Sequence, residues 1–276
     1  MLDDVLPVLA CPLCGRAMAR SGGSVRCEGG HAFDVARQGY VNLQPGGARP
    51  GTADTAEMVE ARERFLAAGH YADLAALVAE RAAAAWPGGG CVVDAGAGTG
   101  YLLSHLLDAL PGPPAGLALD LSTYAARRAA RAHPRIGAVV TDTWQRFPVR
   151  DRAAGLVLNA FAPRNGPELR RILRDDGALL VATPTPDHLT ELVSRLDLLT
   201  VDARKPERLA GTLNPWFTLD ATTRYATTLR LTAEAVRAAV TMGPSARHGT
   251  DEAALAALPS PLPVTVSVTI STYHPR

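Results

Sequence analysis

The chain has 276 residues, 47% of them hydrophobic, and a formal net charge of +1. This length and apolar content can bury one large α/β core and leave room for a small appendage. The near-neutral charge argues against a protein that attracts nucleic acid through its total charge, so any RNA contact must come from local patches. No N-terminal segment joins basic residues to a long apolar run, so we expect no signal peptide, no membrane span and a cytoplasmic location.

Four potential metal ligands lie close together near the N-terminus. Cys11 and Cys14 are separated by two residues, and twelve residues further on Cys27 and His31 are separated by three. Two such chelating turns on either side of a hairpin suit tetrahedral zinc, and the lack of a secretion signal disfavours a disulfide. Residues 1–45 otherwise lack the periodicity of a packed core, so we predict a small module held together by zinc. Four protein ligands leave no open position, which predicts a structural metal.

Residues 46–87 are predicted to connect this module to the main domain. Residues 46–51 are rich in glycine and contain a proline, as linkers often do. Asp54 and Glu57 then form a capping pattern at the start of a helix. A second helix is predicted over residues 72–86, where a proline and three glycines end it.

From residue 88 to the C-terminus, short apolar runs alternate with helical stretches, which is the pattern of a doubly wound, mostly parallel sheet. Two later segments alternate apolar residues with Thr or Ser, as half-buried antiparallel strands do. We therefore expect a seven-stranded sheet in an α/β fold. The predicted strands are Cys91–Ala95, Gly116–Asp120, Ile136–Val140, Gly155–Ala160, Ala178–Thr183, Ala226–Leu231 and Val264–Ser271. Helices are expected to begin near Tyr101, Ser122, Asn165 and Asp187.

A glycine-rich turn follows the first of these strands and opens a helix. Glycine permits both a tight bend and close approach of a nucleotide-like cofactor to the backbone. Asp94 precedes the turn, Asp120 ends the next strand where it can take ribose hydroxyls, and Asp142 follows the third strand. A NAD site would place the third glycine one residue later, so the spacing favours S-adenosylmethionine and a methyltransferase. The three glycines are Gly96, Gly98 and Gly100.

The fourth predicted strand ends in the segment Asn159-Ala160-Phe161-Ala162-Pro163. In parallel α/β sheets the carboxyl ends of the strands form the ligand crevice, so we expect this segment to face the transferred methyl group. Its carbonyl groups could hold the edge of a planar base, and Phe161 could stack on that base. Asn159, Phe161 and Asp142 are therefore the candidate catalytic residues. A loop packed for shape alone is the alternative.

Several short motifs, taken together, resemble those of the 23S rRNA guanine-N1 methyltransferases. They are Cys11-Pro-Leu-Cys14, Cys27-x3-His31 with Phe33-Asp34, Gly39-Tyr40-Val41-Asn42-Leu43, Met58-x3-Arg62, Gly69-His70-Tyr71, the turn from Asp94 to Gly100, Phe161-Ala162-Pro163 and Thr183-Pro184. Within that family the chain is most similar to the branch of macrolide-producing actinobacteria, in which methylation protects the ribosome from a tylosin-type antibiotic. Met242-Gly243-Pro244-Ser245 adds to the similarity.

This resemblance implies a class I S-adenosylmethionine-dependent methyltransferase fold behind an N-terminal zinc module. It implies structural zinc at Cys11, Cys14, Cys27 and His31, and cofactor contacts from Tyr71, Leu102, Leu103 and His188. The implied partner is 23S rRNA, methylated at a guanine in hairpin 35 of the exit tunnel, with macrolide resistance as the consequence. Thr99, in place of an acidic residue, and the lack of an aromatic in Ser245-Ala246-Arg247 depart from the pattern of relatives.

Guanine N1 must lose a proton as it attacks the methyl group, so the enzyme needs orientation first and a proton acceptor second. Asp142, His70 and His188 are the candidate acceptors. Arg164 follows the crevice segment directly and is predicted to contact an RNA phosphate. The arginines of residues 127–135 are interpreted as a solvated helix face.

Two other functions stay open from the sequence. One is a small-molecule methyltransferase of a biosynthetic cluster, which the zinc module disfavours because a small substrate seldom needs it. The other is a non-catalytic RNA- or protein-binding module with a vestigial cofactor fold, which the complete set of glycines and acids disfavours. The sequence also leaves open whether the chain forms a homodimer.

Overall fold

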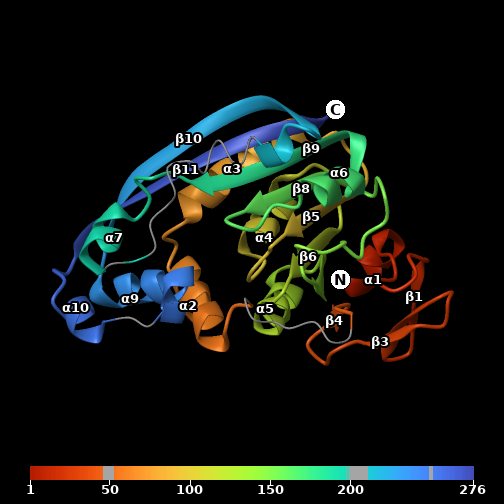
Figure 1. Ribbon diagram of the computed structural model, residues 1–276, viewed down its shortest axis with the longest axis horizontal. Coiled ribbons are helices and arrows are strands. Elements are labelled where there is room, and N and C mark those ends of the chain that lie inside the picture. The colour runs from red at the N-terminus through yellow and green to blue at the C-terminus, as the bar shows by residue number, and fades with distance from the viewer. Residues whose placement is uncertain (46–52, 197, 199–210, 249–250) are drawn as a thin grey trace.

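A computed structural model describes residues 1–45, 53–196, 198, 211–248 and 251–276 of the chain. These residues form a three-stranded sheet near the N-terminus and an eight-stranded sheet that carries the rest of the fold (Figure 1). The predicted linker over residues 46–51 lies outside the described residues. No helix in the described ranges is long and apolar enough to cross a membrane.

The N-terminal part begins with α1 (Leu2–Val5) and the 3-10 helix η1 (Leu6–Val8), which lead to the small antiparallel sheet. Its strands are β1 (Met18–Ser21), β2 (Ser24–Cys27) and β3 (Ala32–Asp34). Helix α1 packs directly on the large sheet. A Cβ added at Gly137 of that sheet would lie 2.3 Å from a methyl carbon of Val5, so only glycine leaves room for this helix.

The next strand, β4 (Tyr40–Asn42), leaves the small sheet and pairs in parallel with β7 (Ile136–Val140) of the large one. The order of the large sheet is β10-β11-β9-β8-β5-β6-β7-β4. The expectation of seven strands is therefore wrong by this one addition. Val41 is fully buried, so β4 covers an edge of β7 that would otherwise present unpaired backbone groups.

The remaining strands lie at their predicted positions, but β9, β10 and β11 extend beyond their predicted ranges. Those of the large sheet are β5 (Cys91–Ala95), β6 (Gly116–Asp120), β8 (Ala154–Ala160), β9 (Leu173–Pro184), β10 (Phe217–Leu231) and β11 (Leu262–Pro275). The six neighbouring strands β9, β8, β5, β6, β7 and β4 run parallel to one another. Strand β11 is antiparallel to both of its neighbours, β9 and β10. Strand β10 exceeds its predicted range because β11 pairs with it from Phe217 to Leu231.

Helices cover both faces of the large sheet. They are α2 (Ala56–Ala67), α3 (Ala72–Ala85), α4 (Tyr101–Ala109), α5 (Thr123–Ala132), α6 (Gly166–Ile172), α7 (Thr190–Leu196), α9 (Ala233–Thr241) and α10 (Glu252–Ala256), with the 3-10 helix η2 (Pro244–His248). Two apolar cores result, one on each face: Val92 belongs to the first and its neighbour Val93 to the second. This double coverage explains why β5 reads as a continuous apolar run.

The start of α2 differs from its predicted capping pattern. Thr55 is the N-cap, and its hydroxyl accepts a hydrogen bond from the Met58 amide at 3.2 Å. Asp54 instead forms an ion pair with Arg62, at 2.6 Å, because the Arg62 side chain, in the second turn of α2, lies beside it. Ser122 caps α5 as expected.

Candidate functional site

The four predicted metal ligands meet in the N-terminal part of the structure. All of their ligand atoms lie within 4.8 Å of one another. The Cys27 sulfur is 3.4 Å from Nδ1 of His31 and 3.6 Å from the Cys14 sulfur, and Nδ1 of His31 is 3.6 Å from the Cys11 sulfur. Zn–S and Zn–N bonds of about 2.3 and 2.0 Å place tetrahedral ligands about 3.5–3.8 Å apart, so the side chains fit one zinc ion.

Glycines in the two chelating turns let the backbone bend tightly around the four ligands. The Gly15 amide donates to the Cys11 carbonyl and the Gly30 amide donates to the Cys27 carbonyl, which closes both chelating turns. A Cβ at Gly29 would lie 3.1 Å from the Cys14 sulfur, so this glycine leaves space for the ligand. With four protein ligands the zinc has a structural role.

A cavity of about 840 Å³ lies at the carboxyl ends of the central strands β5, β6, β7 and β8. It sits where the order of strands reverses between β5 and β8, the position at which doubly wound sheets bind nucleotide cofactors. Residues of α2, α7, α9 and η2 line its other side. A volume of this size suits a nucleoside cofactor together with part of a second substrate.

The glycine turn after β5 forms part of the cavity wall. Gly96 and Gly98 have φ values of 92° and 53°, which favour glycine, and both line the cavity. A Cβ at Gly96 would lie only 2.3 Å from that of Ala162, so the turn touches the segment after β8. Asp120 holds the turn in place, because its carboxylate accepts hydrogen bonds from the amides of Gly98 and Ser122, both at 2.8 Å.

Asp94 lines the same cavity but lacks such partners. Its side chain is 2% exposed, and within the described residues its Oδ1 atom has no hydrogen-bond partner. Burial, reinforced by the nearby Asp120 carboxylate, raises the pKa of Asp94 to about 8. A buried, unpaired carboxyl oxygen at this place fits the cationic methionine end of S-adenosylmethionine, which would supply the missing donor.

Three aromatic side chains of the cavity lining lie close to one another. The ring centroids of Tyr71 and Phe161 are 6.5 Å apart and nearly parallel, at 22°, and that of His188 is 6.0 Å from Phe161. Phe161 is 43% exposed and has a left-handed φ of 54°, which turns its ring out of the line of β8. The arrangement offers a flat apolar surface to a planar base.

The hydrogen bonds of His188 fix which of its ring nitrogens carries the proton. Nδ1 accepts a hydrogen bond from the Ser267 amide at 3.2 Å, so in the neutral ring the proton lies on Nε2. Nε2 is 3.4 Å from the Tyr71 hydroxyl and can donate to it. With one nitrogen accepting and the other already protonated, the geometry gives His188 a role in orienting Tyr71 and argues against its role as proton acceptor.

Some of the predicted site residues lie behind the cavity wall. Leu102 lines the cavity, but Leu103 is fully buried in the core and does not. Gly100 meets α5 instead: a Cβ there would lie 3.1 Å from Cα of Ala129. His70 packs on Phe65, with ring centroids 4.6 Å apart, and is absent from the lining, as is Leu103.

Asn159 also lies behind the cavity, although it was predicted to contact the base. It is fully buried, and its amide nitrogen donates to the backbone carbonyls of Ala95, at 3.0 Å, and Pro163, at 2.8 Å. These bonds tie the end of β5 to the segment after β8, so the geometry gives Asn159 a positioning role for Phe161. Asp142, by contrast, lines the cavity and accepts a hydrogen bond from the Trp144 amide at 2.9 Å.

Arg164 turns inward from the crevice. Its guanidinium donates to the Thr183 hydroxyl at 2.8 Å, and burial lowers its pKa. The predicted contact with an RNA phosphate would require this half-buried side chain to leave its partner. On the other arginine segment, Arg128 pairs with Glu63 at 3.1 Å, whereas Arg127 and Arg131 are exposed, in line with a solvated helix face.

Two motifs of the sequence, Met58-x3-Arg62 and Met242-Gly243-Pro244-Ser245, meet in the structure. Arg62 donates to the Met242 carbonyl at 2.8 Å and pairs with Asp54, so it joins α2 to the segment after α9. Its Nη1 atom would lie 3.2 Å from a Cβ at Gly98. Residues 242–245 line the cavity, so the contact of Arg62 with Met242 holds this C-terminal segment in place as part of the cavity wall. Only the spacing Met58-x3-Arg62 hinted at it.

The order of the large sheet, its antiparallel β11 and the glycine turn after β5 define a class I S-adenosylmethionine-dependent methyltransferase. The family model described as "RlmA, N-terminal", a zinc ribbon, matches residues 9–48. A Streptomyces fradiae relative, named 23S rRNA (guanine(748)-N(1))-methyltransferase, is 49% identical over 100% of this chain and 99% of its own. The chain belongs to the 23S rRNA (guanine-N1)-methyltransferase family.

Two further relatives have names of the same activity. One, from Micromonospora griseorubida, is 50% identical and covers 100% of both chains. The other, from Bacillus subtilis, is 35% identical over 66% of this chain and 66% of its own.

Proposed function

We propose that this protein transfers the methyl group of S-adenosylmethionine to N1 of a guanine in 23S rRNA. The observation that carries the proposal is identity of 49–50% over the full chain, zinc module included, to relatives named for that reaction. The fold and cavity support it, because a cofactor-sized site at the strand ends opens beside a flat aromatic surface. The domain limits 1–45, 46–87 and 88–276 are proposed with it.

The cofactor, when bound, supplies a methyl group already activated by a positively charged sulfur. The chain then has to hold both reactants in line, which supplies much of the rate in such transfers. In this proposal Asp94 and the glycine turn bind the cofactor, and Phe161, supported by Tyr71, stacks on the guanine. Asp142 is the best candidate to accept the N1 proton. It lines the cavity, and the Trp144 amide occupies only its Oδ1 atom. His70 does not line the cavity, and Nδ1 of His188 already accepts a hydrogen bond.

The target proposed is a guanine at position 748, the position named for the Streptomyces fradiae relative. The family resemblance of the sequence implies that this guanine lies in hairpin 35 of the exit tunnel. Methylation there would add bulk where macrolides of the tylosin type bind and so confer resistance. A small-molecule methyltransferase accounts less well for the zinc module of this chain, because a small substrate seldom needs one. A vestigial, non-catalytic module accounts less well for the unpaired Asp94 at an open cofactor site.

Primer extension on 23S rRNA from cells with and without the gene tests the proposal. Methylation at N1 blocks base pairing, so a new stop is expected next to guanine 748 only when the gene is present. A Gly96→Val variant, whose side chain would overlap Ala162, is expected to abolish the stop. Absence of any new stop, with methyl transfer to another substrate, would contradict the proposal. Failure of the purified protein to bind S-adenosylmethionine in calorimetry would instead favour the non-catalytic alternative.

A further inference from the structure

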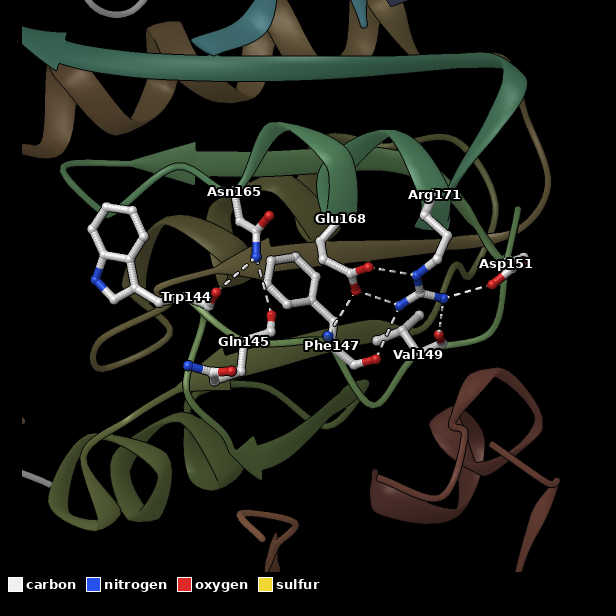
Figure 2. Close-up of polar contacts among 8 residues, drawn as sticks. All are labelled: Trp144, Gln145, Phe147, Val149, Asp151, Asn165, Glu168 and Arg171. Atoms are coloured by element: carbon white, nitrogen blue, oxygen red, sulfur yellow. Dashed lines mark hydrogen bonds and ion pairs between the residues drawn. The ribbon is translucent and has the colours of Figure 1, made fainter. Parts of the chain in front are cut away.

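The loop between β7 and β8, residues 142–151, is held along its backbone by α6. Asn165, the N-cap of this helix, donates to the carbonyls of Trp144 and Gln145, both at 3.1 Å (Figure 2). Glu168 accepts a hydrogen bond from the Phe147 amide at 2.8 Å. Arg171 donates to the carbonyl of Phe147 at 3.0 Å and to that of Val149 at 2.7 Å, and pairs with Glu168 and Asp151, both at 2.6 Å. The loop therefore has one fixed course.

This fixed backbone presents three consecutive exposed side chains, Trp144, Gln145 and Arg146. Trp144 is 61% exposed, an unfavourable position for the largest apolar side chain. Its ring projects away from α6 in Figure 2, and it lines the rim of the cofactor cavity. Within the described ranges no ion-pair partner is found for Arg146, so its charge faces solvent. A rigid indole next to a free cation is the chemistry that binds a nucleotide by stacking and phosphate contact.

The other end of the same loop pairs with residues 8–10, the stem that leads into the zinc module at Cys11. The Ala10 amide donates to the Pro148 carbonyl at 3.0 Å, and the Arg150 amide donates to the Val8 carbonyl at 2.9 Å. Leu9 and Val149 form an isolated antiparallel bridge between these bonds. The loop thus connects the zinc module, one residue before Cys11, to the rim of the cavity.

We propose that Trp144 stacks on an rRNA base that flanks the target guanine, while Arg146 binds a phosphate of the same strand. The loop runs from the residues before Cys11 to the cavity, so an RNA strand bound at both places can contact its exposed side chains. The proposal rests on the proposed function. The adenine of the cofactor is the alternative stacking partner for Trp144 at this rim.

Substitution of Trp144 tests the stacking contact. For Trp144→Ala we expect the KM for a 23S rRNA fragment containing hairpin 35 to rise about 5- to 150-fold, as loss of one base–aromatic contact predicts, with little change in kcat. Trp144→Phe is expected to restore most of the affinity. The matched control is Tyr124→Ala, which removes a 50% exposed aromatic from α5 that does not line the cavity, and should leave KM unchanged.

A spectroscopic measurement separates stacking from a general structural effect. Stacking of a base on Trp144 should quench part of the tryptophan fluorescence when the RNA fragment is added, and Trp144→Phe should lose that quenching. The temperature of unfolding of Trp144→Ala should match that of the unchanged protein, since the removed side chain is mostly exposed. A variant that retains the full quenching would overturn the proposal.

The charge of Arg146 is tested through salt dependence. Arg146→Ala should weaken RNA binding and reduce the slope of log affinity against log salt by about one, as for one lost phosphate contact. Arg127→Ala, which removes an exposed arginine on α5, is the control and should leave the slope unchanged.

The outcomes distinguish this inference from the function on which it rests. If the unchanged protein does not methylate the rRNA fragment, the proposed function fails. If it does, and Trp144→Ala has normal KM, the inference alone is overturned. If the affinity for S-adenosylmethionine, measured by calorimetry without RNA, falls in Trp144→Ala by the same factor as RNA affinity, Trp144 belongs to the adenine site and the inference is also overturned.

Discussion

At the scale of single residues, Asp94 and Asp120 are two neighbouring acids with opposite hydrogen bonding. Asp120 accepts two backbone amides, which offset part of the cost of its burial. Asp94 is more deeply buried, yet its Oδ1 has no partner within the described residues, and its pKa is raised to about 8. A charged carboxylate without partners is costly in an apolar site, so the cofactor-free protein holds Asp94 mainly in its protonated form at neutral pH.

This raised pKa predicts how stability depends on pH. Because the folded pKa of about 8 lies above the ordinary 3.8, unfolding releases the Asp94 proton between these values. The free energy of unfolding of the cofactor-free protein should therefore fall as pH rises from 4 to 8, by at most about 1.4 kcal/mol per pH unit from this group. Urea unfolding of the unchanged protein and of Asp94→Asn across this window measures it.

Asp94→Asn should remove that part of the pH dependence and also weaken binding of S-adenosylmethionine, whose affinity in the unchanged protein should increase with pH up to about 8. Identical pH profiles for the two proteins would show that Asp94 ionises normally. Gly98→Ala, at a position of positive φ on the same turn, separates damage to the turn from loss of the carboxyl group.

At the scale of elements, a seven-residue helix governs the course of a ten-residue loop. Helix α6 directs Asn165, Glu168 and Arg171 toward the 142–151 loop, and Arg171 alone contacts two carbonyls and the Asp151 carboxylate of the loop, besides Glu168 of its own helix (Figure 2). The Arg171 side chain is 16% exposed, so removal of the guanidinium leaves these acceptors without a donor in a partly dry site.

Arg171→Met should therefore lower the free energy of unfolding by about 1–3 kcal/mol. It should also raise the KM for rRNA, because the loop would no longer hold Trp144 at the cavity rim. The matched control is Arg174→Met. The Arg174 side chain is 32% exposed, twice as much as that of Arg171, and loss of its ion pair with Asp176 should change the free energy of unfolding by about 0.5 kcal/mol or less. Equal effects of the two substitutions, measured by urea unfolding, would argue against the role of Arg171 in holding the 142–151 loop.

At the scale of the whole molecule, backbone pairing joins the N-terminal part to the methyltransferase core at two places, in addition to the packing of α1 on the large sheet. The stem before Cys11 pairs with the 142–151 loop, and β4 joins the edge of the large sheet beside β7. The zinc cluster lies between these two attachments in the sequence. Its metal therefore holds a segment whose two ends are fixed to the core by backbone pairing (Figure 1).

Loss of zinc should consequently disorder the small sheet without unfolding the core. We expect one zinc ion per chain, loss of that ion in Cys14→Ala, and its retention in Cys91→Ala, since Cys91 is a core residue of β5. Metal content by mass spectrometry checks the first part. Calorimetry checks the second: Cys14→Ala should keep its affinity for S-adenosylmethionine and lose at least about tenfold in affinity for rRNA. Loss of both affinities together would show that the core depends on the metal.

The sequence by itself determined those features that arise from contacts between near neighbours in the chain. Strands β5, β6 and β7 were predicted residue for residue, because strands buried on both faces are apolar throughout and stop where the apolar run stops. The four zinc ligands follow from two short chelating spacings, and the cofactor turn follows from glycines at required backbone angles.

Only the tertiary structure decided the features that depend on a distant partner. Strand β4 is three residues long, too short for a periodicity, and becomes a strand because β7 offers a free edge. Asn159 was expected at the base, but the carbonyls of Ala95 and Pro163 take both of its amide hydrogens. The course of the Trp144 loop depends on side chains about twenty residues further along the chain, and bonds from a side chain to a distant backbone leave no pattern in the sequence.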